Sequence, residues 1–103
     1  DVPPPAAPAR LSLAAPAPNP ARRRTSVSYE IPSSAAGRPF TLDLYDMAGR
    51  RVRRLAQGSG TPGRYGAQWD LRDGRGDFVR SGLYLLVLEA AGERRSRRLV
   101  VLP

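Results

Sequence analysis

Residues 65–84 read YGAQWDLRDGRGDFVRSGLY, and this stretch decides the fold. It contains the only Trp of the chain, Trp69, followed by a run rich in Asp and Gly. A single Trp in a chain with few aromatic residues is expected to be the largest side chain of the core. Asp70 and Asp73 can accept hydrogen bonds from backbone N–H groups, and Gly76 supplies a positive φ without steric cost. The stretch therefore predicts an aromatic anchor, a structured turn and the entry to a central strand.

The segment after this turn is the most hydrophobic of the sequence. Gly82 precedes residues 83–90, LYLLVLEA, in which Tyr84 is the second residue. A run that is apolar at nearly every position is typical of a central strand covered on both faces. The triplet Ala-Gly-Glu at 91–93 predicts a turn, and residues 94–102 predict a returning last strand.

Alternation of apolar and polar residues predicts the other strands, because successive side chains of a strand point to opposite faces. Asp46 and Gly49 begin and end a four-residue turn of the type I pattern, so they predict a hairpin. The further segments expected to be strands are residues 25–31, 40–45, 50–56 and 64–70. With turn signals at short intervals and no helical periodicity, the sequence predicts an all-β fold, a small antiparallel β-sandwich of about seven strands.

The N-terminal 20 residues differ in composition from the rest of the chain. They hold seven of the 11 prolines and are otherwise mostly Ala, so they favour extended structure and resist helix. We interpret residues 1–20 as a Pro/Ala-rich linker or arm and residues 21–103 as the β-sandwich domain. Leu11 and Leu13 interrupt the prolines, could add a short edge strand at residues 10–14, and make this segment a candidate assembly arm.

Composition argues against an enzyme. The chain has no Cys and no His, which removes disulfides, thiol chemistry, Cys-based metal sites and the commonest general base. No apolar run of about 18 residues is present, so we expect no transmembrane helix. The chain begins at Asp1 rather than Met, which we interpret as a piece of a longer product.

Three acids of the central turn lie close together in the sequence and could form a calcium site or an acid–base pair. Asp70, Asp73 and Asp77 do not have the spacing of an EF-hand, and nothing near them predicts a cleft in which two carboxylates could act as acid and base. Capping of the turn explains the same residues. We therefore expect no catalytic residue, no metal and no cofactor, and we treat the Arg-Gly-Asp triplet at 75–77 as a chance match.

Charge is the most unusual property of the composition. All 17 basic residues are Arg, and the formal net charge is +8. The Arg clusters at residues 22–24, 50–54 and 94–98 have two interpretations: protection of sheet edges against unwanted pairing, or binding of an acidic surface such as an anionic polysaccharide or lipopolysaccharide. The candidate recognition residues are Arg50, Arg51, Arg94, Arg95, Arg97 and Arg98. Few aromatics are free for base stacking, so we expect no nucleic acid.

Taken in order, these segments resemble a bacterial family: the C-terminal sorting domains of type IX secretion substrates and the related FlgD-type immunoglobulin-like modules of hook-capping proteins. The resemblance covers about residues 11–103. It rests on the Asn-Pro phrase within residues 13–21, the strand at 25–32, LDLYDMAGRRV at 42–52, the Gly, Trp-Asp and Ser-Gly-Leu-Tyr pattern of 63–84, and the Leu-Val-Val-Leu ending.

Two departures from the family pattern stand out. The family commonly has Gly after Trp-Asp, where this chain has Leu71, so the departure predicts a different geometry for that turn. Lys is frequent in the last hairpin of sorting domains, where this chain has Arg. The positive charge is kept and the amine chemistry is not.

The resemblance implies an immunoglobulin-like sandwich that does no chemistry, is exported behind a cargo, and is recognised by outer-membrane secretion and attachment machinery through its last hairpin. Its location would be extracellular or on the outer surface of a bacterium with an outer membrane, without membrane insertion. The alternative is a structural subunit that assembles with copies of itself into an extracellular filament or lattice, its N-terminal arm adding a strand to a neighbour.

Overall fold

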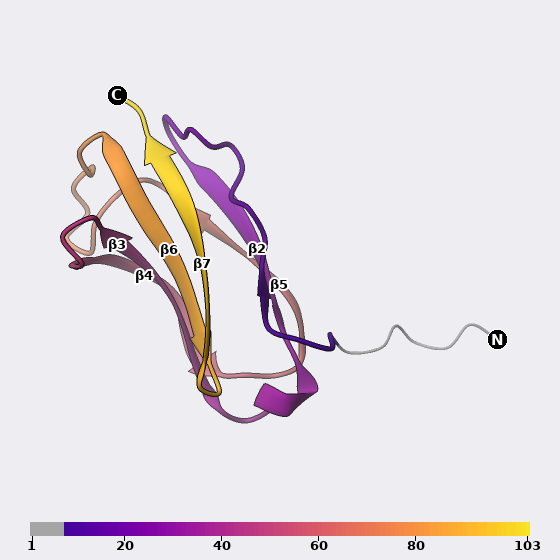
Figure 1. Cartoon of the computed structure of the whole chain (residues 1–103). Helices are drawn as coiled ribbons and strands as arrows, with labels where there is room; N and C mark the ends of the chain where they lie inside the picture. The colour runs from indigo at the N-terminus through magenta and orange to yellow at the C-terminus, as the bar shows by residue number, and fades with distance from the viewer. Residues whose placement is uncertain (1–7) are drawn as a thin grey trace.

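A computed structural model of the chain describes residues 8–103 and shows two β-sheets packed face to face (Figure 1). The predicted all-β sandwich is confirmed. The first seven residues of the predicted arm lie outside the described part. One sheet has the strand order β1-β2-β5, and the other has the order β4-β3-β6-β7. The strands are β1 (Ser12–Leu13), β2 (Thr25–Ile31), β3 (Pro39–Asp46), β4 (Arg51–Ser59), β5 (Gly63–Trp69), β6 (Gly82–Ala90) and β7 (Glu93–Val101), and a single 3-10 turn, η1, spans Ser33–Ala35.

All pairings between these strands are antiparallel, and the inward residues follow the alternation of the sequence. The core lies between the sheets and is formed mainly by aliphatic side chains around Trp69. Its largest fully buried members are Trp69, Leu11, Ile31, Leu42, Leu44, Leu86, Leu88 and Leu99. No helix in residues 8–103 is long and apolar enough to cross a membrane.

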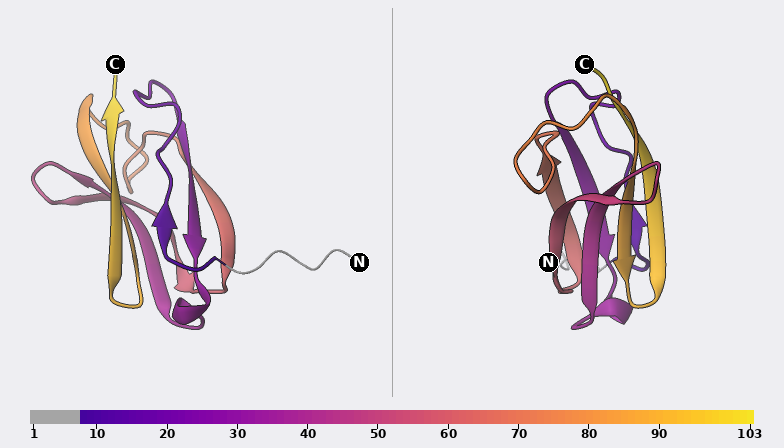
Figure 2. Two further views of the ribbon diagram at one scale, coloured as in Figure 1. Left: turned by 45° about the vertical axis from the view of Figure 1, so that its right-hand side comes forward. Right: turned by 90° about the vertical axis from the view of Figure 1, so that its left-hand side faces the viewer.

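Strand β6 is central, between β3 and β7, but the expectation that another layer covers both of its faces is wrong. Its inward residues pack on the opposite sheet, whereas its outward face has no further layer over it (Figure 2). Val87 is nevertheless only 1% exposed on that outward face, with Asp43 and Ser96 beside it in register. Side chains of its own sheet therefore shield Val87, which explains an apolar residue at an outward position.

Strand β4 departs from regular pairing at two places. Its register with β3 shifts between Leu42 and Asp43 and again between Leu44 and Tyr45. Such bulges bend a strand and increase its twist. Figure 2 shows the β3–β4 hairpin turning away from the body of the sandwich.

A bidentate ion pair joins these two strands beside the bulges. The Asp43 side chain is 4% exposed, and its two carboxylate oxygens accept bonds from Nε and Nη2 of Arg54 at 2.8 and 3.1 Å. The Arg54→Met variant leaves a buried carboxylate without its partner, so we expect it to lower the free energy of unfolding by about 2–3 kcal/mol. Urea denaturation measures this loss. The double variant Asp43→Val/Arg54→Met should lie closer to wild type than the single variant does, and an equal or larger loss in the double variant contradicts the interpretation.

The described part of the arm, residues 8–20, folds back onto its own domain. Leu11 and Leu13 are buried in the core, and β1 pairs with β2. The arm then follows the free edge of β7. There the Asn19 side-chain amide donates a hydrogen bond to the Arg98 carbonyl and accepts one from the Val100 N–H. Residues 8–21 thus close one side of the sandwich.

Candidate functional site

The loops of the sandwich gather at two ends (Figure 1). The first end, which we call the basic end, contains residues 22–24, the β3–β4 turn and the β5–β6 loop. Thr25 at the start of β2 pairs with Trp69 at the end of β5, and Asp46 at the end of β3 pairs with Tyr84 near the start of β6, so the segments beyond these residues lie at the same end. The opposite end contains the β6–β7 turn, η1 and the β4–β5 connection. The candidate residues of the sequence are divided between these ends.

The turn after Trp69 is held by its own side chains. Trp69 is 1% exposed, its Nε1 donates to the Arg72 carbonyl at 2.8 Å, and its ring meets that of Tyr84 edge-on at 5.8 Å. The Asp70 carboxylate accepts from the Arg72 N–H, and that of Asp73 accepts from the N–H groups of Arg75 and Asp77. Asp70 also pairs with the Arg53 guanidinium at 3.4 Å. The Asp70 and Asp73 carboxylates are thus occupied by backbone N–H groups and one Arg side chain.

Two residues of this turn adopt left-handed backbone conformations. Gly76 has a φ of +90°, and Leu71 has a φ of +62° although it carries a side chain. The backbone at Leu71 thus takes the conformation that Gly favours, and its side chain is buried in the core. Burial of that side chain offsets a backbone cost of about 1–2 kcal/mol. In residues 8–103 no three Asp or Glu side chains converge as metal ligands.

Tyr84 and Gly82 place the start of β6 against this loop. The Tyr84 hydroxyl donates to the Arg80 carbonyl at 2.6 Å, and burial raises the pKa of that hydroxyl. Gly82 has a φ of +150° where the loop enters the strand. These contacts fix the second end of the β5–β6 loop.

The β3–β4 turn is capped by Asp46. Its Oδ1 accepts from the N–H groups of Ala48 and Arg50, its Oδ2 pairs with the Arg50 guanidinium at 3.2 Å, and Gly49 has a φ of +84°. The bond from the Arg50 N–H is the main reason that the pKa of Asp46 lies below its ordinary value. The acid form of Asp46 is therefore disfavoured in the folded chain.

This lowered pKa predicts a pH-dependent effect of the Asp46→Asn variant. The pKa of Asp46 is lower in the folded chain than in the unfolded chain, where it is near 3.8. The ionised carboxylate therefore stabilises the fold at pH values above the unfolded-state pKa, and this contribution is lost as the pH falls through the folded-state pKa. We expect Asp46→Asn to be less stable than wild type at pH 7 and the difference to shrink toward pH 2. Urea titrations at several pH values measure it. A difference that is constant with pH contradicts the expectation.

The β6–β7 hairpin places its four Arg residues on two faces. Arg94 and Arg98 point outward from the sandwich, with Arg94 near Glu89 at 3.8 Å. Arg97 points inward, where its Nε donates to the Leu13 carbonyl at 2.8 Å. Arg95, on the same face as Arg97, is half-buried and bonds the Arg94 carbonyl.

These four residues do not form one surface with Arg50 and Arg51. Arg97 fastens the arm, and only Arg94 and Arg98 of the hairpin face solvent on the outer side of the sheet. Arg50 and Arg51 lie at the basic end, where the hollow they line also contains Arg75 and Arg80. The last two were absent from the predicted set because only the tertiary fold brings the β5–β6 loop beside the β3–β4 turn.

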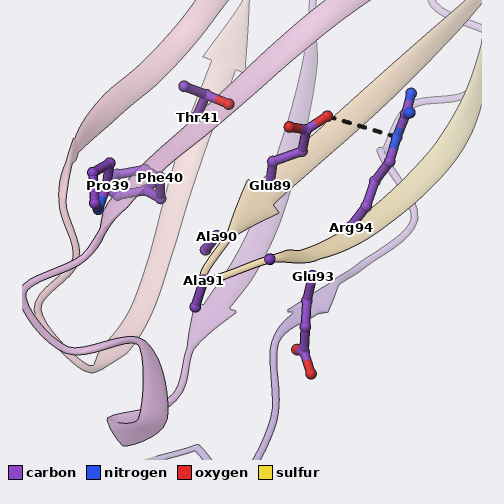
Figure 3. A pocket seen from close by; sticks show the side chains of 9 residues that line it. Pro39, Phe40, Thr41, Glu89, Ala90, Ala91, Glu93 and Arg94 are labelled. Carbon is purple, nitrogen blue, oxygen red and sulfur yellow. Dashed lines mark ion pairs between the residues drawn. The ribbon is translucent and has the colours of Figure 1, made fainter.

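A second hollow of about 430 Å³ lies beside the β6–β7 turn (Figure 3). Phe40 and Ala90 contribute apolar surface to it, and the Glu89–Arg94 pair stands at its side. The turn itself is tight, since Ala91 and Gly92 both have positive φ, +53° and +79°. This two-residue turn matches the twist of the strands and holds the hairpin in register over its whole length.

No protein family and no curated protein matches this sequence. Among solved structures, the fold is similar to part of dimeric latent PorU from Porphyromonas gingivalis, with a TM-score of 0.57 and 22% identity over 89% of this chain. It is also similar to part of PorZ from the same organism, an essential bacterial surface component of the type IX secretion system, with a TM-score of 0.54 and 20% identity over 90% of this chain.

A third similar structure is the Pseudomonas fluorescens alkylpurine DNA glycosylase AlkC bound to DNA with an abasic site analogue, with a TM-score of 0.58 and 16% identity over 94% of this chain. The chain spans only 9% of PorU, 11% of PorZ and 32% of AlkC. Because proteins of such different kinds share this fold at low identity, the likeness shows the fold alone: a β-sandwich that occurs as one part of larger proteins.

Proposed function

We propose that this chain is a non-catalytic sorting and attachment module of a secreted bacterial protein, recognised by type IX secretion machinery at the outer membrane. The observation that carries the proposal is that nearly the whole chain matches about a tenth of PorZ, a surface component of that system. The likeness to PorU, of similar extent, supports the same function. Its place is then extracellular or on the outer cell surface.

The β6–β7 hairpin is the part of the module that we expect the machinery to recognise. Arg94 and Arg98 project outward from it, and the hollow at its turn combines apolar and charged groups. An exposed pair such as Glu89–Arg94 contributes little to stability, so Arg94 is free to serve a partner.

Export of a reporter tests this function. A periplasmically targeted fluorescent protein carrying the full chain at its C-terminus is expressed in a bacterium that has the type IX system, and the reporter is quantified on the cell surface and in the medium. We expect export with the wild-type module and a loss of about tenfold with Arg94→Gln/Arg98→Gln, because two charged contacts at an interface are removed.

The matched control is Arg10→Gln/Arg38→Gln, which removes the same charge from exposed positions outside the hairpin. We expect it to be exported like wild type. Retention of the wild-type fusion inside the cell would refute the sorting function, and equal losses in both variants would refute the hairpin as the recognised element.

The alternative function, assembly into a filament or lattice through an exchanged arm, has a structural cost in this fold. Leu11 and Leu13 would have to leave the core of their own domain before they could enter a neighbour. The arm is also hydrogen-bonded to β7 of the same chain through Asn19, and so is the adjoining residue, Ala21. This arrangement favours the sorting module, and a concentration-independent monomer by light scattering is the expected result.

A further inference from the structure

The basic end of the sandwich contains a hollow of about 520 Å³ between the β3–β4 turn and the β5–β6 loop. This volume falls within the range of small-molecule sites. Four Arg and two Asp residues line it, together with Val52, Val79, Gly74 and Tyr84. The charged residues are Arg50, Arg51, Arg75, Arg80, Asp46 and Asp73.

Three of the four Arg side chains have no carboxylate partner. Arg50 pairs with Asp46, whereas Arg51, Arg75 and Arg80 form no ion pair among residues 8–103. A cluster of unpaired like charges repels itself, so it binds an anion more favourably than isolated Arg residues do.

The backbone beneath each of these three residues is fixed. Arg51, in β4, pairs with Tyr45 of β3. The Arg75 N–H donates to the Asp73 carboxylate, and the Arg80 carbonyl accepts from the Tyr84 hydroxyl. A rigid support lowers the conformational entropy lost when guanidinium groups engage a ligand. The bonds of the two loops therefore fix the backbone positions from which these Arg side chains extend.

The two carboxylates in the lining restrict the class of anion. Both Asp46 and Asp73 hold backbone N–H groups through Oδ1. Among the described residues no hydrogen bond reaches Oδ2 of Asp73. A carboxylate oxygen repels a continuous run of phosphates but accepts a hydrogen bond from a hydroxyl group. The lining therefore suits a ligand that carries anionic groups and free hydroxyls together.

We propose that this hollow binds an acidic saccharide, whose sulfate, phosphate or carboxylate groups pair with Arg51, Arg75 and Arg80 while ring hydroxyls donate to the carboxylates. Planar guanidinium groups bind such oxyanions through two parallel hydrogen bonds. The lining contains neither Arg94 nor Arg98 nor any residue of the β6–β7 turn, so this proposal stands independently of the sorting function.

A single-stranded nucleic acid fits the hollow less well. Its binding sites combine basic groups with exposed aromatic rings on which bases stack. The one aromatic residue of the hollow, Tyr84, is buried, and its hydroxyl is already bonded to the chain. Phe78, the exposed aromatic of the loop, lies outside the lining and is covered by the Arg72 guanidinium at 4.0 Å.

Isothermal titration calorimetry of the full chain in 0.15 M NaCl tests the proposal with three probes: a sulfated heparin hexasaccharide, an oligogalacturonate of six residues, and a 12-nucleotide oligothymidylate. The variant Arg51→Gln/Arg75→Gln/Arg80→Gln is compared with Arg10→Gln/Arg23→Gln/Arg38→Gln. The two variants lose the same charge, but the second leaves the hollow intact. All six residues have exposed side chains, and thermal unfolding followed by circular dichroism checks that both variants fold.

We expect the wild type to bind at least one of the two saccharides more tightly than the oligonucleotide. The affinity should fall at least about tenfold in the variant of the three hollow residues. It should fall no more than about threefold in the control, because the control changes only the net charge of the protein and no residue that lines the hollow. Equal losses in both variants, no saccharide binding at millimolar concentration, or tighter binding of the oligonucleotide would each overturn the proposal.

Discussion

Replacement of Trp69 by Ala is expected to lower the free energy of unfolding by about 3–5 kcal/mol. The side chain is 1% exposed, its ring packs edge-on against Tyr84, and its Nε1 donates to the Arg72 carbonyl. The variant loses buried area, an aromatic contact and a bond that holds the following loop. A domain of this size has about 5–10 kcal/mol in total, so the variant should be barely folded at 25 °C.

Urea denaturation followed by far-UV circular dichroism measures this effect without relying on Trp fluorescence. Phe78→Ala is the matched control, because Phe78 lies in the same loop region but is 67% exposed and contacts mainly Arg72. We expect the control to change stability by no more than about 1 kcal/mol. A loss below 1 kcal/mol in Trp69→Ala would show that the core does not depend on this side chain.

Truncation of the arm's two leucines, Leu11→Ala/Leu13→Ala, should cost at least about 4 kcal/mol, because each removes a buried aliphatic side chain worth about 2–5 kcal/mol. Both residues are at most 4% exposed. The free energy of unfolding from urea titration measures the loss. Ala14→Ser/Ala15→Ser is the control at neighbouring exposed positions and should behave like wild type. Near-wild-type stability of the leucine variant would mean that the arm is dispensable to its own domain.

The strands were predictable from the sequence because their signal is local. Alternation along residues 25–31 and 64–70 depends only on which face of a strand is buried, and the Asp46 and Asp73 turns depend on side chains that bond backbone groups two to four residues away. Local patterns of this kind survive without knowledge of the tertiary fold. The confirmed two-sheet architecture follows from them.

Three features depended on the tertiary fold and escaped prediction. Leu11 and Leu13 are buried because the arm returns to its own domain, which no local pattern indicates. Leu71 adopts a left-handed backbone conformation while its side chain enters the core, and that burial is likewise set by the tertiary fold. The meeting of Arg51 with Arg75 and Arg80 depends on which loops share an end of the sandwich. The positions of the Arg residues along the sequence instead group Arg51 with the Arg residues of the β6–β7 hairpin.

The attachment of the arm to β7 also bears on when the domain can fold. The Arg97 side chain bonds Leu13 across 84 positions of sequence, and Asn19 bonds Val100 across 81. Contacts of such separation form late and slow the folding of β-proteins. The sandwich cannot close until the segment that ends with Val101 is available to the arm. A nascent chain therefore cannot form these bonds until its last strand has been synthesised.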